Sequence, residues 1–195
     1  LVSILGILVL GTLLELLAGL VELRSLDPKL PAEFVGVYDP ERYARAQEYT
    51  RASIRLALVR RTVGLALTVA FVLAGGFNLV DALARGLGLP PVPTGLVFTG
   101  LVALLAAAVQ LPFSIYATFG IEERFGLNTT TPLTFVLDTL KGMLLAVVLG
   151  GPLLAGVFLL FDTGGPSAWM VCWLAVSAFL LVIQFVAPVL LLPLF

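Results

Sequence analysis

Hydrophobic residues in this chain form long continuous runs, unlike the alternating or one-faced patterns of soluble proteins. Four runs contain no charged residue and cover residues 62–80, 86–121, 142–161 and 163–195. Each is near or above the roughly 20 residues that a helix needs to cross a bilayer. A fifth run, residues 1–23, is apolar apart from Glu15 and Glu22. The pattern predicts an all-α, multi-pass membrane helical bundle with about five transmembrane helices.

Turn signals at the ends of the runs set the expected boundaries of the helices. We place the five spans at about residues 1–23, 62–80, 94–121, 139–161 and 167–192. The first run lacks the basic start and the small-residue cleavage site of a signal peptide, so we expect it to be retained. The chain begins at Leu and ends within an apolar run. We therefore interpret it as a piece of a longer polypeptide.

The distribution of basic residues predicts the orientation. Eight of the 11 Lys and Arg residues lie between spans one and two. Arg124 lies between spans three and four, and Lys141 lies at the start of the fourth helix. Arg85 alone lies between spans two and three. Because cytoplasmic loops carry the excess of Lys and Arg, residues 24–61 and 122–138 are expected to be cytoplasmic loops. The N-terminus is then outside, and the C-terminal end is cytoplasmic.

The first cytoplasmic loop is expected to contain a helix. Asp39, Pro40 and Glu41 have the order of an N-cap, a first-turn proline and an acidic residue at a helix start. No Pro or Gly occurs from Arg42 to Arg61, so this cytoplasmic helix can continue into span two. Its basic residues are interpreted either as an ordinary positive flank along the lipid headgroups or as a docking surface for a cytoplasmic domain.

Composition agrees with the membrane assignment and excludes several functions. Hydrophobic residues make up 60% of the chain, charged residues make up 12%, and the mean hydropathy is +1.12. These values lie outside the range of soluble globular domains. The sequence shows no P-loop, GxSxG or GxGD motif, and the chain contains no His and a single cysteine, Cys172. We expect the lipid bilayer, and no nucleic acid, as a partner.

The polar segment 111–141 separates two apolar runs and holds most of the motifs. Pro112 removes a backbone donor from the third helix. Gly126 is placed to end that helix in the left-handed conformation, and Thr131 with Pro132 is placed to begin the next helix. Asp138 and Lys141 share a helix face, and they form either a local ion pair or part of a wider polar network.

The residues of this segment carry a resemblance to a known family. LPFSIYATFGIEERFGLNTTTPLTFVLDTLK resembles the type I CAAX prenyl endopeptidases, whose pattern runs close to LPFS-x-Y-x-TF-x-IEE-x-x-GFN-x-x-T with a later D-x-x-K. Leu127 departs from it, since the family tends to have Phe there. FVGVYDPERYARAQEY is similar to the family's first cytoplasmic loop, and the spans that contain Pro152 and Pro188 resemble its fourth and fifth.

The resemblance implies that residues 1–195 are the N-terminal transmembrane domain of an integral-membrane HExxH zinc metallopeptidase. Two His one turn apart bind zinc in such enzymes, and the Glu between them activates water. Because the chain contains no His, we assign no catalytic and no metal-binding residue here. The resemblance instead implies that the zinc domain lies downstream of Phe195. The alternative is a non-enzymatic membrane protein, such as a small transporter or an inactive scaffold.

The resemblance also implies roles for the polar residues of the spans and the second loop. Polar groups within a span usually face protein or a water-filled cavity. Five of them are expected to line an intramembrane chamber: Glu15, Gln110, Ser114, Tyr116 and Gln184. For Glu15 a protonated or partnered carboxyl inside the bundle is equally open, and Gln110 and Gln184 are open to ordinary interhelical hydrogen bonds. Six others are expected to contact the catalytic lobe: Glu122, Glu123, Arg124, Asn128, Asp138 and Lys141.

The expected substrates are peptides or lipidated peptides. They are either prenylated C-termini or, in a bacterium, other membrane-associated polypeptides. The Arg-rich, Ala- and Leu-rich composition is typical of a GC-rich bacterium. We therefore expect a bacterial inner membrane, or the endoplasmic reticulum membrane if the source is eukaryotic.

Overall fold

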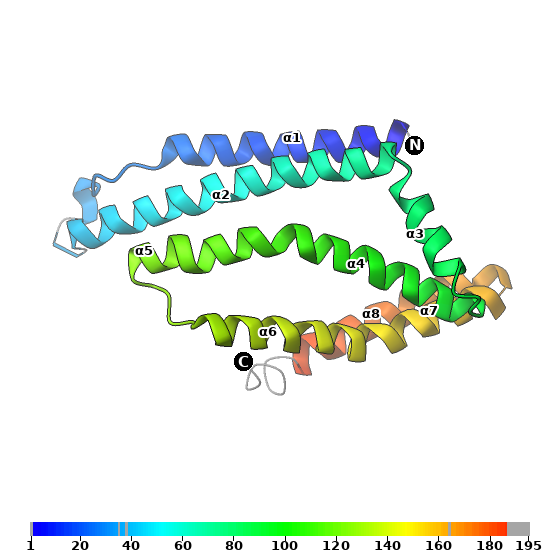
Figure 1. The fold of residues 1–195 in the computed structure, drawn as a ribbon. Coiled ribbons are helices and arrows are strands. Elements are labelled where there is room, and N and C mark those ends of the chain that lie inside the picture. The colour runs from blue at the N-terminus through cyan, green and yellow to red at the C-terminus, as the bar shows by residue number, and fades with distance from the viewer. Residues whose placement is uncertain (1, 35, 38, 164, 187–195) are drawn as a thin grey trace. The chain divides into compact units, whose positions relative to one another are not determined.

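The computed structural model describes residues 2–34, 36–37, 39–163 and 165–186, and all of its regular elements in these ranges are helices (Figure 1). By its internal contacts the chain divides into two compact units. One unit contains residues 1–79 and 102–129, and the other contains residues 80–101 and 130–195.

The first unit begins with a pair of antiparallel helices, α1 (Val2–Ser25) and α2 (Pro40–Leu73) (Figure 1). A short 3₁₀ turn, Ala32–Phe34, lies between them. The backbone N–H of Glu41 donates to the Asp39 carboxylate at 3.0 Å, so Asp39 is the N-cap and Pro40 is the first helical residue. The helix then continues for 34 residues, which confirms the expected unbroken passage into the second span.

Helix α2 ends at Leu73 rather than at Val80, because a glycine pair follows it and turns the chain. Gly75 has a φ of +71°, a left-handed conformation that glycine adopts at little cost. A Cβ on Gly76 would lie 2.4 Å from the Phe71 ring, so this position also needs a residue without a side chain. A short helix, α3 (Gly76–Arg85), follows.

The third long helix is continuous but not uniform. It comprises α4 (Pro91–Tyr116), a π-helical segment η2 (Ala117–Glu122) and a last turn α5 (Glu123–Phe125). Together they give an apolar stretch of 35 residues, Pro91–Phe125. Its second half belongs to the first unit, where η2 packs against α2.

The second unit contains the fourth and fifth long helices. The fourth comprises α6 (Pro132–Leu145), a π-helical segment η3 (Ala146–Gly150) and α7 (Gly151–Thr163). The N–H of Thr134 donates to the Thr131 hydroxyl at 3.1 Å, which confirms the expected N-cap. A 3₁₀ turn, Gly165–Ser167, leads to α8 (Ala168–Val186), which packs against α7. Residues 187–192 of the predicted fifth span lie outside the described residues.

Five helices are long and apolar enough to cross a membrane, and most of their large apolar side chains are exposed within the chain. The buried apolar residues among those described are few: Val80, Ala84, Ile121, Ala168 and Cys172. A helix that is apolar all round needs an apolar environment. The bilayer core contains no water to hydrogen-bond backbone N–H and C=O groups, and a helix satisfies these groups internally. The chain is therefore a multi-pass membrane protein.

Candidate functional site

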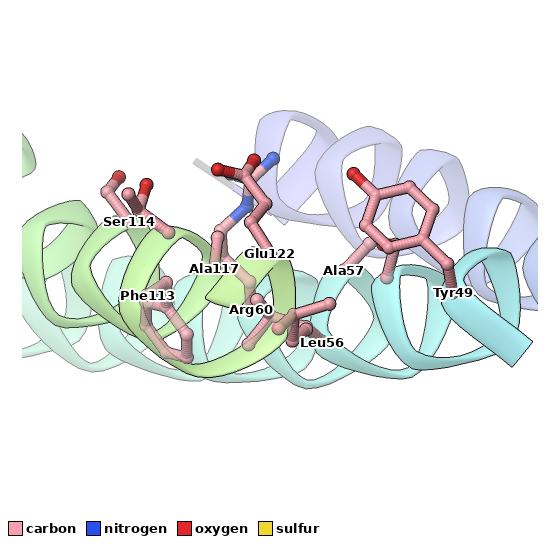
Figure 2. A pocket seen from close by; sticks show the side chains of 11 residues that line it. Tyr49, Leu56, Ala57, Arg60, Phe113, Ser114, Ala117 and Glu122 are labelled. Atoms are coloured by element: carbon pink, nitrogen blue, oxygen red, sulfur yellow. The ribbon is translucent and has the colours of Figure 1, made fainter. Parts of the chain in front are cut away.

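A pocket of about 370 Å³ lies in the first unit, between α2 and the segment formed by the end of α4 and η2 (Figure 2). Phe113, Leu56 and Ile121 contribute apolar wall. Ala57 and Ala117 add small apolar surface, and the remaining lining residues are polar. They consist of two charged side chains and four hydroxyls: Arg60, Glu122, Tyr49, Ser53, Ser114 and Thr118.

The π-helical segment η2 explains how one helix presents so many groups to α2. Pro112 has no N–H to donate to the preceding turn, and the wider turns of η2 begin five residues later. A π-helix is rare and often marks a functional site. Within the same stretch, Ser114 and Thr118 line the pocket, whereas the Tyr116 side chain does not and is 59% exposed.

The two charged groups of the pocket face the same space. Figure 2 shows the Arg60 side chain extending from α2 toward the Glu122 carboxylate on η2. Neither side chain has an ion-pair partner among the residues that the structure describes. The pocket therefore offers one cation and one anion to whatever occupies it.

The turn that follows Glu122 is held against α2. Gly126 has a φ of +72° and its N–H donates to the Glu123 carbonyl at 3.1 Å, so it is the left-handed cap that the sequence predicts. The side-chain amide of Asn128 donates to the Glu123 carboxylate at 2.8 Å. The rings of Phe125 and Tyr49 meet edge to face, with centroids 5.5 Å apart. The turn is thus fixed at the Tyr49 end of the pocket.

An ion pair joins α1 and α2 beside this site. The Arg61 Nε lies 3.2 Å from the Glu15 Oε2, and Arg61 also donates to the Glu15 carbonyl at 3.4 Å. At the end of α1, the Arg51 guanidinium donates to the Leu26 carbonyl at 2.9 Å. The structure gives Glu15 an ion-pair partner on α2 and leaves its side chain 61% exposed. It also places Arg51 to Arg61 beside α1, ahead of the span start predicted at residue 62.

The second unit holds two further pairs of charges. The Lys141 ammonium donates to the Asp138 carboxylate at 3.1 Å, so these residues form the local ion pair that their spacing allowed. The Arg85 Nε donates to the Asp81 carboxylate at 2.7 Å, and this hydrogen bond, followed by the attraction between the charges, raises the pKa of Arg85. Asp81 and Arg85 line a pocket of about 480 Å³ in which these charges neutralise each other.

The structure brings together only some of the residues that the sequence singled out. Ser114 and Glu122 share the pocket in the first unit. Gln110 and Gln184 are exposed on α4 and α8, and Glu123 and Arg124 are exposed at the turn. The sequence did not indicate four of the pocket residues, because each depends on the pairing of α2 with η2: Tyr49, Ser53, Arg60 and Thr118. A signal in the sequence exists for two of the four: Ser53 and Arg60 are seven residues apart, which places them on one helix face.

No metal centre can be assembled from the described residues. They contain no group of three or more His, Cys, Asp or Glu side chains that could hold a metal ion. The whole sequence also lacks His, the ligand of the HExxH motif. The described residues therefore do not fit a zinc site.

Comparison with known proteins establishes the family. A family model described as "CAAX prenyl protease N-terminal, five membrane helices" matches residues 22–195. The chain belongs to the CAAX prenyl protease family and corresponds to its N-terminal membrane region.

Individual relatives agree in sequence and in fold. The chain is 30% identical to a CAAX prenyl protease 1 homolog of Arabidopsis thaliana, with 99% of this chain and 47% of the relative covered. It is 29% identical to CAAX prenyl protease 1 of Saccharomyces cerevisiae, with 87% and 40% covered. The crystal structure of S. mikatae Ste24p superposes with a TM-score of 0.88 at 25% identity, with 98% and 46% covered. The chain thus spans less than half of the length of each.

Proposed function

We propose that this chain is the membrane region of a zinc metalloendopeptidase, in which it forms walls of an intramembrane chamber and seats a catalytic segment outside these 195 residues. The observation that carries the proposal is the family match over residues 22–195, since the relatives are named CAAX prenyl proteases. The absence of His from the sequence supports a division of labour in which another segment supplies the zinc ligands.

Charges within the spans support the chamber. A charged side chain at the centre of a lipid-facing helix costs about 2.5–3.5 kcal/mol on insertion scales. Glu15, Arg60, Arg61 and Glu122 all lie on helices that are candidates to cross the membrane. A polar interior would remove most of that cost. On the same argument, five residues remain proposed to line the chamber: Glu15, Gln110, Ser114, Tyr116 and Gln184.

The catalytic segment is proposed to rest on the turn after η2. Glu123 and Arg124 are exposed there, and the Glu123–Asn128 hydrogen bond fixes the shape of the turn. The surplus of basic residues favours the cytoplasmic side for this turn, and for Asp138 and Lys141 at the start of the next helix. Glu122 differs, because its side chain turns into the pocket.

The function is tested by hydrolysis of a prenylated peptide by the full-length polypeptide in liposomes. We expect cleavage near the lipidated cysteine that 1,10-phenanthroline abolishes and added zinc restores, because HExxH chemistry depends on the metal. The full-length sequence should carry HExxH beyond residue 195, and replacing its Glu with Gln provides the matched inactive control. Absent or chelator-insensitive cleavage would contradict the proposal and favour a non-enzymatic membrane protein.

A further inference from the structure

Arg60 and Glu122 give the pocket in the first unit a charge pattern that an apolar or purely anionic ligand does not match. Each lacks an ion-pair partner among the described residues, yet both line the same space (Figure 2). Charges in a low-dielectric environment interact strongly and are costly when left unpaired. A ligand with a negative group for Arg60 and a positively charged N–H donor for Glu122 would satisfy both.

The charged side chains of the pocket lie at the end of the third long helix that leads into the turn. Arg51 contacts the carbonyl of Leu26 just beyond the end of α1, and Arg61 reaches Glu15 within α1. At 1.5 Å per residue, Arg60 is about 14 Å along α2 from the border that Arg51 marks. The Arg60 side chain extends back toward Glu122, which is followed at once by the turn. The charged part of the pocket is therefore near the turn, and the wall that Phe113 lines lies farther from it.

The remaining walls suit an amphipathic ligand. Hydroxyls from Ser53, Ser114 and Thr118 add hydrogen-bonding groups, while Phe113 and Leu56 provide apolar surface. The volume of about 370 Å³ lies within the range of small-molecule sites.

We propose that this pocket binds the headgroup of a zwitterionic aminophospholipid, of the phosphatidylethanolamine type, with the phosphate on Arg60 and the ammonium on Glu122. A guanidinium is well suited to a phosphate because it offers several N–H donors in a fixed plane. The primary ammonium can donate hydrogen bonds to Glu122, whereas the quaternary ammonium of phosphatidylcholine has no N–H. An anionic lipid without an amine, such as phosphatidylglycerol, leaves Glu122 unpaired. The proposal depends on membrane insertion and not on proteolysis.

Lipid competition on the full-length protein tests the proposal. The protein in detergent micelles is offered equal amounts of phosphatidylethanolamine, phosphatidylcholine and phosphatidylglycerol with the same acyl chains, and bound lipid is counted by native mass spectrometry. We expect about tenfold more bound phosphatidylethanolamine than either other lipid, because its ammonium can donate a charge-assisted hydrogen bond to Glu122. Equal retention of the three lipids, or a preference for phosphatidylglycerol, would overturn it.

Single substitutions separate the two contacts. Glu122→Gln should lower the ethanolamine-to-choline ratio about tenfold, toward equality, because the neutral amide no longer attracts the ammonium. Arg60→Gln should lower binding of both lipids and keep the ratio. Arg55→Gln is the matched control, since this exposed neighbour on α2 does not line the pocket, and it should behave as wild type. An unchanged ratio in Glu122→Gln would contradict the proposal, and the wild-type competition is decisive even if Arg60→Gln fails to fold.

Discussion

Replacing Arg61 with Ala should lower the free energy of unfolding of the full-length protein by about 1–3 kcal/mol and reduce the amount of protein inserted in the membrane. The substitution leaves Glu15 charged within α1 without its partner at 3.2 Å. The loss stays below the full cost of an isolated charge in lipid, because the two side chains are 42% and 61% exposed. Thermal unfolding in detergent and quantification of the membrane fraction measure both effects.

Three variants show whether the effect of Arg61→Ala belongs to the ion pair. Arg55→Ala removes an exposed charge from the same helix and should change the stability little. The charge swap of Glu15→Arg with Arg61→Glu should recover most of the loss. The neutral pair of Glu15→Gln with Arg61→Gln should also be better tolerated than Arg61→Ala, because no charge is left alone. Equal losses in Arg61→Ala and Arg55→Ala would show that the pair does not stabilise the α1–α2 contact.

Alanine substitutions at two glycines should have opposite effects. Gly126→Ala should cost about 1–2 kcal/mol, because residue 126 has a φ of +72° and a side chain destabilises the left-handed conformation. Gly142→Ala should stabilise by up to about 1 kcal/mol, because residue 142 lies within α6 with nothing within 4 Å of an added Cβ. Differential scanning fluorimetry of the full-length protein measures both shifts.

The Gly126 substitution should also affect proteolysis, because its turn carries Glu123 and Arg124. We expect Gly126→Ala to reduce peptide hydrolysis in the full-length protein at a temperature where it remains folded, and Gly142→Ala to leave hydrolysis unchanged. An unchanged or raised unfolding temperature in Gly126→Ala would show that the left-handed cap does not stabilise the turn.

Local features of the fold could be predicted from the sequence, because each depends on neighbouring residues only. The N-caps at Asp39 and Thr131 and the cap at Gly126 are set by the chemistry of a few adjacent positions. Apolar runs of sufficient length likewise predict five long helices. The family followed from the polar segment 111–141, where many fixed residue types lie close together.

The pocket could not be predicted, because it depends on which helices pair and in which register. The charge pattern predicts that the second span begins after the last charge, at residue 62. Arg60 is therefore predicted to lie in the first cytoplasmic loop. The structure sets α2 against α1 from Arg51 onward, and it sets η2 against α2. The end of α2 at Leu73 was missed for a related reason, since no charged or proline residue marks Gly75 and Gly76. The length and position of a charge-free run do not indicate which helix it packs against or in which register.

Site-specific photocrosslinking in the full-length protein shows whether the turn after η2 seats a catalytic segment. A photoreactive amino acid is placed at Arg124, which is exposed at the turn, or at Ser167, which is exposed between α7 and α8 at the end expected outside. We predict crosslinks from position 124 to peptides beyond residue 195, and none to those peptides from position 167. Crosslinks that are absent at position 124, or equally strong at position 167, would contradict the account.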